Sequence, residues 1–242
     1  MKVTRLPVLL TLIFAVASGA SGQSISGQNP VIHDHIFHWP LAFQFDGTGP
    51  TVDVGNRSGL NTPTFTISAF VKFNSLTHPP GDNKERPIGD MSIVDKMFAP
   101  NDTFSGDNVD GWRLLKQDVG LFMFCFGGGL VNGCTGEPSA PTVFSTTAPV
   151  VGVWYNVVGV LSKSEIAIYV NGVKEGSKPL TSFTDTHSAD MRIGSSAEGD
   201  GYAFFNGVID EVTFHPKALD RKDIEALCAE KNGGVACHQG KH

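Results

Sequence analysis

The sequence has too little positive charge to suggest a partner with a phosphate backbone. Its 242 residues contain 18 lysines and arginines against 24 aspartates and glutamates, which gives a formal net charge of −6 at pH 7. Proteins that bind nucleic acid or anionic lipid do so through clustered lysine and arginine side chains, and the basic residues here are scattered. The charge balance therefore argues against nucleic acid as a partner.

Long apolar runs are also missing beyond the start of the chain. A helix that spans a bilayer needs about 20 apolar residues, and no segment after the first two dozen residues offers them. The first residues instead have the pattern of a secretory signal peptide, in which the positive Lys2 and Arg5 precede an apolar stretch at 8–17 and small residues at 18–22. We expect residues 1–22 to be removed and the mature protein to be secreted, extracellular and not inserted in a membrane.

Cysteines are few, and the four present fall into two pairs that are close in sequence, Cys125 with Cys134 and Cys228 with Cys237. An exported chain meets an oxidising compartment, in which such cysteines form disulfides. Three connectivities are formally possible, but local pairing closes two small loops and needs no long-range contact. A zinc site is the alternative, and the C-x-x-C spacing that brings two thiolates to one ion is absent. We therefore expect two local disulfides.

Two glycosylation acceptors follow from the same compartment. The triplets that begin at Asn56 and Asn101 fit the pattern N-x-[ST], whereas Pro63 rules out the triplet at Asn61. We expect a glycoprotein with both acceptors on exposed turns.

Alternation of apolar and polar residues dominates the chain. Between Thr64 and Phe73 the odd-numbered residues are apolar and the even-numbered ones are polar apart from Phe70. This is the period-2 pattern of a strand with one buried face, and Phe70 predicts that the other face is half covered. Gly, Pro, Asn and Asp are enriched in the turns between the segments. Further strands are expected at 41–46, 91–97, 111–116, 120–126, 153–161, 165–170, 191–194 and 207–214.

Two local signals complete the description of the elements. Asn171 and Gly172 lie between two strands and predict a type I′ hairpin turn, which needs positive φ at both central residues. Near the C-terminus, Asp220 predicts the start of a helix by capping a first-turn N–H. Ile224 and Leu227 give this helix an apolar stripe that we expect to dock on the sheet.

Many short strands and one terminal helix predict an all-β fold, a two-sheet antiparallel β-sandwich or jelly roll with a short C-terminal helix. The chain has no internal repeat and no segment with the composition of an interdomain linker. We assign residues 23–40 to an irregular lead-in, 41–230 to a single domain, and 231–242 to a C-terminal tail.

A series of short motifs follows in order along 41–230. They are FDG at 45–47, TFTISAFVK at 64–72, IVDK at 93–96, GWRL at 111–114, VWYNVV at 153–158, IYVNG at 168–172, MRIG at 191–194, IDEVTF at 209–214 and HPKALDRKDI at 215–224. In this order they resemble the laminin-G-like, concanavalin A-like jelly-roll family. The resemblance implies the sandwich fold. It leaves the function open, because the same scaffold carries lectins, adhesion modules, hormone-binding domains and a few glycosidases.

The residues for catalysis are missing from the strand where the family's glucanases carry them. Those enzymes have an E-x-D-x-x-E strand, with one carboxylate as nucleophile and another as acid. The nearest window here keeps Asp210 but has Val208 and Thr213 in place of the outer carboxylates. Asp210 and Glu211 are neighbours, and neighbours on a strand point to opposite faces. No G-x-S-x-G turn supports a serine nucleophile. We expect no catalytic residues.

The resemblance implies instead a structural calcium ion at Asp46 and Asp210, which stand at the family's FDG and IDE positions. Calcium takes six to eight oxygen ligands, and backbone carbonyls would complete the set. The alternative is that Asp210 accepts a neighbouring backbone N–H and Asp46 is a turn residue. The loop at 102–110 is also acidic, but it departs from the EF-hand pattern and is read as a solvated insertion.

Histidines and aromatic residues supply the remaining candidate sites. The segment 33–38 contains three histidines and an aspartate, all common zinc ligands, but its irregular pattern favours a polar lead-in. Trp112 and Trp154 lie within strand motifs and are expected in the core. Aromatic residues nearer loops could stack on a sugar ring; these are Trp39, Phe98, Phe104, Tyr202, Phe204 and Phe205.

We therefore expect a secreted, non-catalytic recognition module that binds a glycan or an extracellular protein. Two alternatives stay open: a structural component of an extracellular or mineralised matrix, which the acidic balance suggests, and a carbohydrate-active hydrolase with a non-standard site. The sequence leaves the ligand-binding residues unidentified.

Overall fold

The computed structural model describes residues 24–26, 29–33, 35–49, 51–77, 89–98, 110–127, 134, 140–180, 189–197, 203–230 and 237. Several predictions fall outside these ranges: the signal peptide at 1–22, the acceptor Asn101, the candidate aromatics Phe104 and Tyr202, and all of the tail at 231–242 except Cys237.

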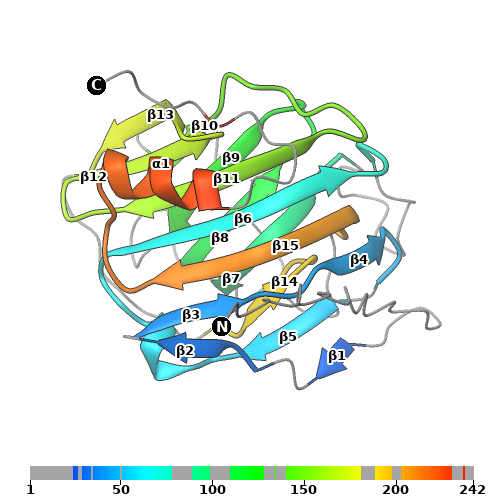
Figure 1. Ribbon diagram of the computed structural model, residues 1–242, viewed down its shortest axis with the longest axis horizontal. Coiled ribbons are helices and arrows are strands. Elements are labelled where there is room, and N and C mark those ends of the chain that lie inside the picture. Colours follow the sequence, from blue (N-terminus) through cyan, green and yellow to red (C-terminus); the bar gives the residue numbers. More distant parts are fainter. Residues whose placement is uncertain are drawn as a thin grey trace, which may run out of the picture.

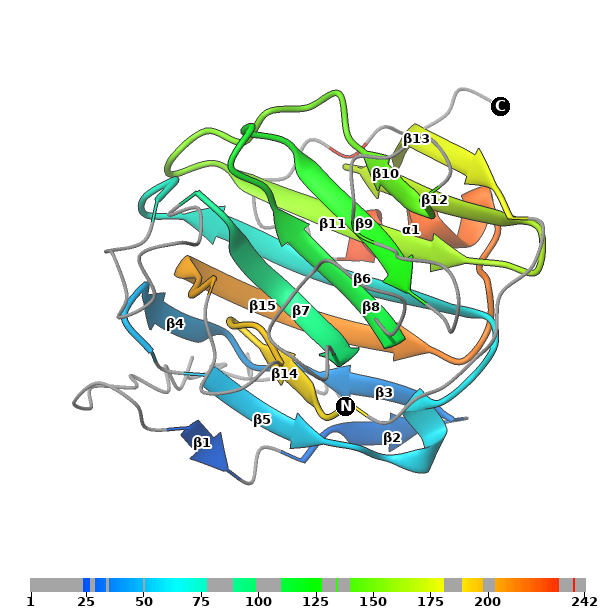
Figure 2. The ribbon, with the colours of Figure 1, turned by 180° about the vertical axis from the view of Figure 1, so that it is seen from behind.

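Two sheets pack face to face, which confirms the predicted sandwich (Figures 1 and 2). The first, here called the helix-bearing sheet, runs in the order β13 (Val173–Pro179), β12 (Glu165–Val170), β11 (Trp154–Leu161), β6 (Phe65–Phe73), β15 (Asn206–His215), β3 (Ile36–Trp39) and β2 (Val31–His33), with β4 (Phe43–Asp46) also paired to β15. The second, the opposite sheet, runs in the order β1 (Ser24–Ser26), β5 (Thr51–Gly55), β14 (Met191–Ile193), β7 (Met91–Phe98), β8 (Asp110–Lys116), β9 (Phe122–Gly127) and β10 (Thr142–Phe144). Neighbouring strands are antiparallel except for the β1–β5 pair.

The core lies between the sheets and is rich in aromatic side chains. The odd-numbered residues of β6 are fully buried, as their alternation predicts. Phe65 contacts Trp112 of the opposite sheet and Phe214 of β15, with ring centroids 5.0 and 5.2 Å apart. Phe73 contacts Phe205 at 4.9 Å. Such contacts stabilise the packing of the two sheets beyond the area they bury.

Three predictions about aromatic residues were wrong. Trp39 and Phe205, assigned to loops, belong to the core. Trp39 is buried because it lies on β3, which pairs with β15. Trp154, assigned to the core, is half-buried on the outer face of the helix-bearing sheet, since it pairs with Lys72 and the Lys72 Nζ lies 5.1 Å from its ring centroid. The prediction for Trp112 is confirmed.

The lead-in at 23–40 is not irregular in its described part. Val31–His33 and Ile36–Trp39 form β2 and β3, and β3 pairs with the last strand, β15. The two strands have three and four residues, which is too short for the alternation of apolar and polar residues to be recognised along the sequence.

β15 contains a bulge at its centre. Asp210 pairs with Phe70 and Thr213 pairs with Ser68, so β15 has one more residue than β6 over this interval. Glu211 lies in the bulge with a φ of 49°, a conformation that non-glycine residues adopt uncommonly. The prediction that Asp210 and Glu211 point to opposite faces rested on regular alternation, and a bulge interrupts that alternation.

The local predictions for turn, helix and disulfides are confirmed. Asn171 and Gly172 have φ values of 52° and 79° in the β12–β13 turn. The helix α1 (Arg221–Glu230) begins as predicted, with the N–H of Asp223 donating to the Asp220 Oδ1 at 2.9 Å. The four cysteines form the bridges Cys125–Cys134 and Cys228–Cys237.

α1 packs on the outer face of the helix-bearing sheet, across β11 and β12 (Figure 1). Its Ile224 and Leu227 pack in a cluster with side chains of the sheet; these are Val158 and Val160 of β11 and Ala167 and Tyr169 of β12. The helix therefore covers only part of this face and leaves the part over β6, β15, β3 and β2 to other side chains.

Candidate functional site

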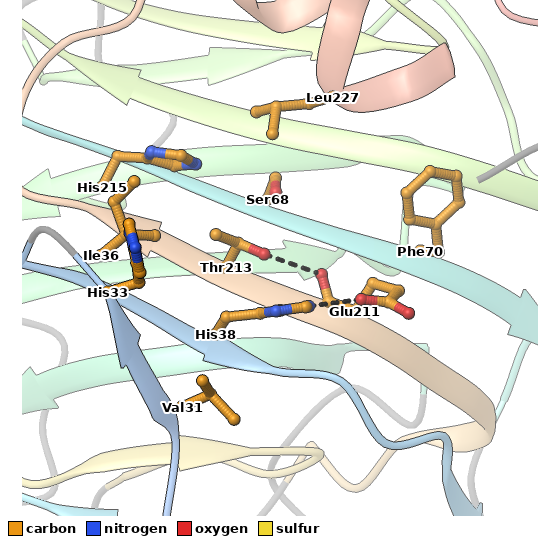
Figure 3. A pocket seen from close by; sticks show the side chains of 10 residues that line it. All are labelled: Val31, His33, Ile36, His38, Ser68, Phe70, Glu211, Thr213, His215 and Leu227. Atoms are coloured by element: carbon orange, nitrogen blue, oxygen red, sulfur yellow. Dashed lines mark hydrogen bonds and ion pairs between the residues drawn. The ribbon is translucent and has the colours of Figure 1, made fainter. Parts of the chain in front are cut away.

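The uncovered part of the helix-bearing sheet forms a hollow of about 480 Å³ beside α1 (Figure 3). Its walls come from five elements, β2, β3, β6, β15 and α1. The lining residues are Val31, His33, Ile36, His38, Ser68, Phe70, Glu211, Thr213, His215 and Leu227. Because three of them are histidines, we call this hollow the histidine pocket.

β6 supplies Ser68 and Phe70, which lie on its even-numbered face. Phe70 was the exception on an otherwise polar face, and it is 6% exposed, as the prediction of a half-covered face requires. Its ring gives the pocket an apolar surface beside the hydroxyl of Ser68.

The bulge in β15 brings Glu211 into the pocket wall. The Glu211 carboxylate accepts a hydrogen bond from the Nε2 of His38 on the neighbouring strand β3 (Figure 3). The Thr213 hydroxyl donates to the backbone carbonyl of Glu211 at 3.4 Å. Two residues from opposite ends of the chain, His38 and Glu211, are thus held together at the centre of the pocket.

His215, at the end of β15, is a buried imidazole on the pocket wall. It is 7% exposed, and among the described residues neither its Nδ1 nor its Nε2 has a hydrogen-bond partner. Burial and, to a smaller extent, the positive charge of Lys217 lower the pKa of His215 to about 4. Buried polar groups in proteins are normally hydrogen-bonded. A neutral His215 therefore presents one donor and one acceptor to whatever enters the pocket.

The edge strands bring together only part of the histidine cluster considered from the sequence. His33 and His38 line the pocket, while His35 is exposed in the turn between β2 and β3, with a φ of 66°. Asp34 lies outside the described residues. Within the described part of the chain, no group of three or more His, Cys, Asp or Glu side chains is arranged to hold a metal ion.

The structure does not bring Asp46 and Asp210 together. Asp46 pairs with Asn206, which lies four residues before Asp210 on β15. At about 3.3 Å per residue, the Cα atom of Asn206 is roughly 13 Å from that of Asp210. Asp46, which lies opposite Asn206, is therefore too far from Asp210 for both carboxylates to lie 2.3–2.6 Å from one calcium ion. Asp46 Oδ1 accepts the N–H and the hydroxyl of Thr48, and Asp210 Oδ1 accepts the N–H of Glu211. These residues therefore do not fit one shared ion.

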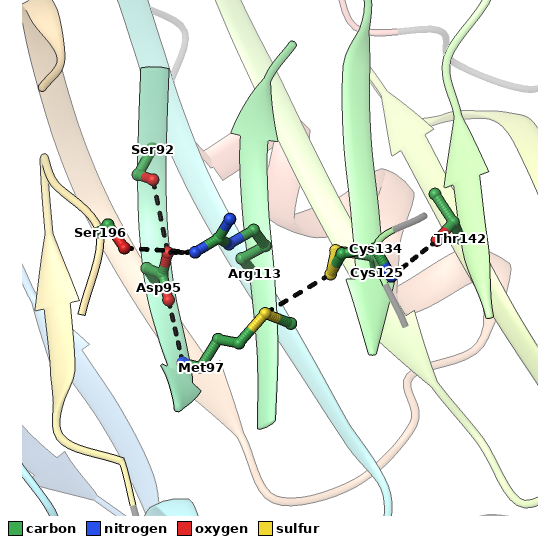
Figure 4. Close-up of a disulfide and its surroundings, with 8 residues drawn as sticks. All are labelled: Ser92, Asp95, Met97, Arg113, Cys125, Cys134, Thr142 and Ser196. Carbon is green, nitrogen blue, oxygen red and sulfur yellow. Dashed lines mark hydrogen bonds and ion pairs between the residues drawn. A yellow bond between two sulfur atoms is a disulfide. The ribbon is translucent and has the colours of Figure 1, made fainter. Parts of the chain in front are cut away.

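The outer face of the opposite sheet carries a buried ion pair (Figure 4). A guanidinium nitrogen of Arg113 lies 2.9 Å from the Asp95 Oδ2, and the N–H of Met97 donates to the Asp95 Oδ1 at 2.9 Å. Burial raises the pKa of Asp95, while Arg113 opposes that shift. Arg113 also donates to the Ser196 hydroxyl at 3.2 Å. The pair joins β7, β8 and the segment after β14, and it has the character of a structural contact.

Asn56, the described glycosylation acceptor, is exposed after β5. Its Oδ1 accepts from the Nδ2 of Asn61 at 3.0 Å and from the Nζ of Lys96 at 3.3 Å. Glycosylation at Asn56 stays a prediction.

Sequence reasoning grouped His33 and His38 but missed the other eight lining residues as members of one site; these are Val31, Ile36, Ser68, Phe70, Glu211, Thr213, His215 and Leu227. The even-numbered face of β6 was the one visible signal, because Phe70 interrupted it. The neighbours of β6 across the sheet, and the bulge that turns Glu211, depend on pairing that local patterns do not specify.

Comparison with known proteins places the fold in a family. A laminin-G family model, described as the concanavalin A-like lectin/glucanase superfamily, matches residues 46–225. No curated protein matches the chain. Among the described residues, α1 falls short of the length and apolar content that crossing a bilayer requires.

Solved structures with similar folds include several binding domains. A carbohydrate-binding domain of Ruminococcus gnavus IT-sialidase, bound to α2,3-sialyllactose, has a TM-score of 0.55 at 14% identity and covers 78% of this chain and 98% of its own. The binding domain of Paraclostridial mosquitocidal protein 1 has a TM-score of 0.55 at 15% identity, covering 84% of this chain and 47% of that one.

The binding domain of botulinum neurotoxin DC in complex with rat synaptotagmin II has a TM-score of 0.51 at 17% identity, covering 84% of this chain and 44% of that one. At these identities the likeness concerns the fold. The family model spans most of the chain and both sheets, and the chain belongs to the concanavalin A-like lectin/glucanase superfamily.

Proposed function

We propose that this protein is a secreted, non-catalytic module that binds a glycan in the histidine pocket. The observation that carries the proposal is His215, a buried imidazole on the pocket wall whose two ring nitrogens have no partner among the described residues. A sugar hydroxyl both donates and accepts hydrogen bonds, so it can satisfy either nitrogen of a neutral imidazole.

The rest of the lining suits the two surfaces of a sugar ring. The hydroxyls of Ser68 and Thr213 can exchange hydrogen bonds with sugar hydroxyls, while Phe70 and Leu227 offer apolar surface to the C–H faces. Binding sites for small molecules commonly combine a mostly apolar lining with a few placed polar groups.

The number of carboxylates in the pocket supports a non-catalytic role. Glycosidases of the common kind use two carboxyl groups that flank the scissile bond. Glu211 is the one carboxylate among the lining residues, and its side chain is already bonded to His38. Among the described residues, the pocket therefore offers groups for binding but only one of the two carboxylates that this hydrolysis uses.

Two observations support secretion. Both predicted disulfides form, and disulfides persist in oxidising compartments. The N-terminal pattern of positive, apolar and small residues is that of a signal peptide.

A glycan array probed with the full mature chain tests the proposal. We expect binding to one group of related glycans, and we expect His215→Phe, which keeps a buried ring but removes both nitrogens, to weaken that binding at least tenfold. His35→Phe is the matched control, because His35 is exposed and does not line the pocket. Circular dichroism verifies that each variant is folded. Absence of binding to every glycan, or full binding by a folded His215→Phe protein, would overturn the proposal.

A further inference from the structure

We infer that the histidine pocket selects uncharged sugars and discriminates against sialylated ones. The inference rests on the proposed function and adds the chemical class of the ligand. It is drawn from the charges around the pocket, which come from four different elements of the fold.

Among the described residues, the lining contains no fixed positive charge. Of the ten described residues that line the pocket, none is lysine or arginine, and Glu211 is the one acidic residue. A sugar carboxylate is normally held by arginine or lysine, through charge-assisted hydrogen bonds that are about twice as strong as neutral ones. The described part of the histidine pocket has no side chain of this kind.

Taken together, His38 and an ionised Glu211 carry no net positive charge. His38 donates to the Glu211 carboxylate. With a neutral His38 the pair carries one negative charge, and with a protonated His38 it carries none. A second carboxylate placed beside this pair would meet either repulsion or no compensating charge.

His215 also fails to supply a cation at neutral pH. Its burial disfavours the charged imidazolium, which is why the pKa of His215 falls to about 4. The charged groups that act on it from outside the lining are Lys217, after β15, and Asp223, on α1, and their influences on this pKa oppose each other. His33, the third histidine, is exposed on the edge strand β2, where water screens its charge.

A sialic acid would therefore transfer a carboxylate from water into a pocket that has polar partners but no counter-charge. Burying an unpaired charge is far more costly than burying a hydroxyl that finds a hydrogen-bond partner. A neutral hexose buries only hydroxyl groups, so its transfer into the pocket has the smaller free-energy cost.

The test compares each sialylated glycan of the array with the same glycan after sialidase treatment, at pH 7.5. We expect the desialylated member of each bound pair to bind at least tenfold more tightly. Glu211→Gln removes the negative charge but keeps an acceptor for His38. We expect this variant to bind the sialylated member more tightly, so that the ratio of the two dissociation constants, sialylated to desialylated, falls below threefold.

The outcomes separate the inference from the function on which it rests. Equal or tighter binding of the sialylated members, lost on His215→Phe, overturns the inference and leaves the glycan site in place. An unchanged ratio in the Glu211→Gln protein also overturns it. Failure of both members of every pair to bind overturns the proposed function, and the inference falls with it.

Discussion

The protonation state of His215 is set by its burial in the folded protein. It lies on the last strand, where the sequence suggests only an ordinary polar position, and tertiary packing buries it to 7% exposure. The consequence is an imidazole that stays neutral well below neutral pH, because burial penalises its charged form.

This neutrality predicts a pH dependence of stability. In the unfolded chain the pKa of His215 returns to about 6.5, so between pH 6.5 and about 4 the unfolded state binds a proton that the folded state does not. The free energy of unfolding should therefore fall as the pH is lowered through this window, by roughly 3 kcal/mol at most from this residue. Urea denaturation of the parent and of His215→Phe between pH 7.5 and 4.5 measures the effect. Parallel pH profiles for the two proteins would contradict it.

The buried pair of Asp95 and Arg113 gives a second prediction for a single residue. Both side chains are nearly inaccessible, so removing the Asp95 carboxylate takes away an ion-pair partner that lies 2.9 Å from a buried guanidinium. We expect Asp95→Ala to lower the free energy of unfolding by about 3–5 kcal/mol. Asp46→Ala, which removes an exposed carboxylate, is the matched control and should cost about 1 kcal/mol or less. Chemical denaturation measures both, and equal losses would show that Asp95 and Arg113 do not act as a buried pair.

Among the elements, α1 decides where the pocket lies. It packs on β11 and β12, and its Leu227 also lines the pocket. The bridge from Cys228 to Cys237 ties the end of α1 to the chain that follows.

Removing this bridge should weaken the packing of α1 on the sheet. We expect the double variant Cys228→Ser with Cys237→Ser to lose about 2–3 kcal/mol of stability, the amount estimated for closing a short loop. Hydrogen exchange should quicken in α1 first, while β6 stays protected at the centre of the sheet. Uniform exchange across α1 and β6 would contradict this local effect.

The bulge in β15 is the element that sequence reasoning could not supply. Asp210 and Glu211 read as regular strand residues, and their pattern predicted opposite directions. The extra residue is recognisable only from the register against β6, where Asp210 pairs with Phe70 and Thr213 with Ser68. That register is fixed by long-range pairing, and through it Glu211 reaches His38.

For the molecule as a whole, the distance between the two proposed calcium ligands changes the prediction for calcium. Asp46 and Asp210 lie too far apart to share an ion. If calcium raises the Tm of the parent protein, we therefore expect at least one of the variants Asp46→Ala and Asp210→Asn to keep that rise. Thermal melting of the three proteins, with calcium and with EDTA, is the measurement. In the parent protein the Asp210 Oδ1 accepts the N–H of Glu211, a role that does not involve calcium. Any fall in Tm caused by Asp210→Asn should therefore be the same in calcium and in EDTA. A rise in the parent that both variants lose would restore a shared site.

The predicted strands show what local patterns can specify. Alternation located β6, β7, β8, β9, β11, β12 and β15 to within a few residues, because a strand with one buried face needs apolar residues at every second position. Asn171 and Gly172 located a hairpin, because the turn needs residues that tolerate a positive φ. The short strands β1, β2, β3, β5 and β10 were missed. Their three to five residues give too few positions for a period to be visible.

The sequence by itself determined the sandwich, the capped helix and the two disulfides, since each depends on residues that are close together along the chain. Only the tertiary structure decided the site. It placed His33 and His38 from the N-terminal strands against Glu211 and His215 near the other end of the chain, and it separated Asp46 from Asp210. The reason is physical: side chains meet across a sheet according to strand order, register and bulges, and these follow from packing of the whole chain.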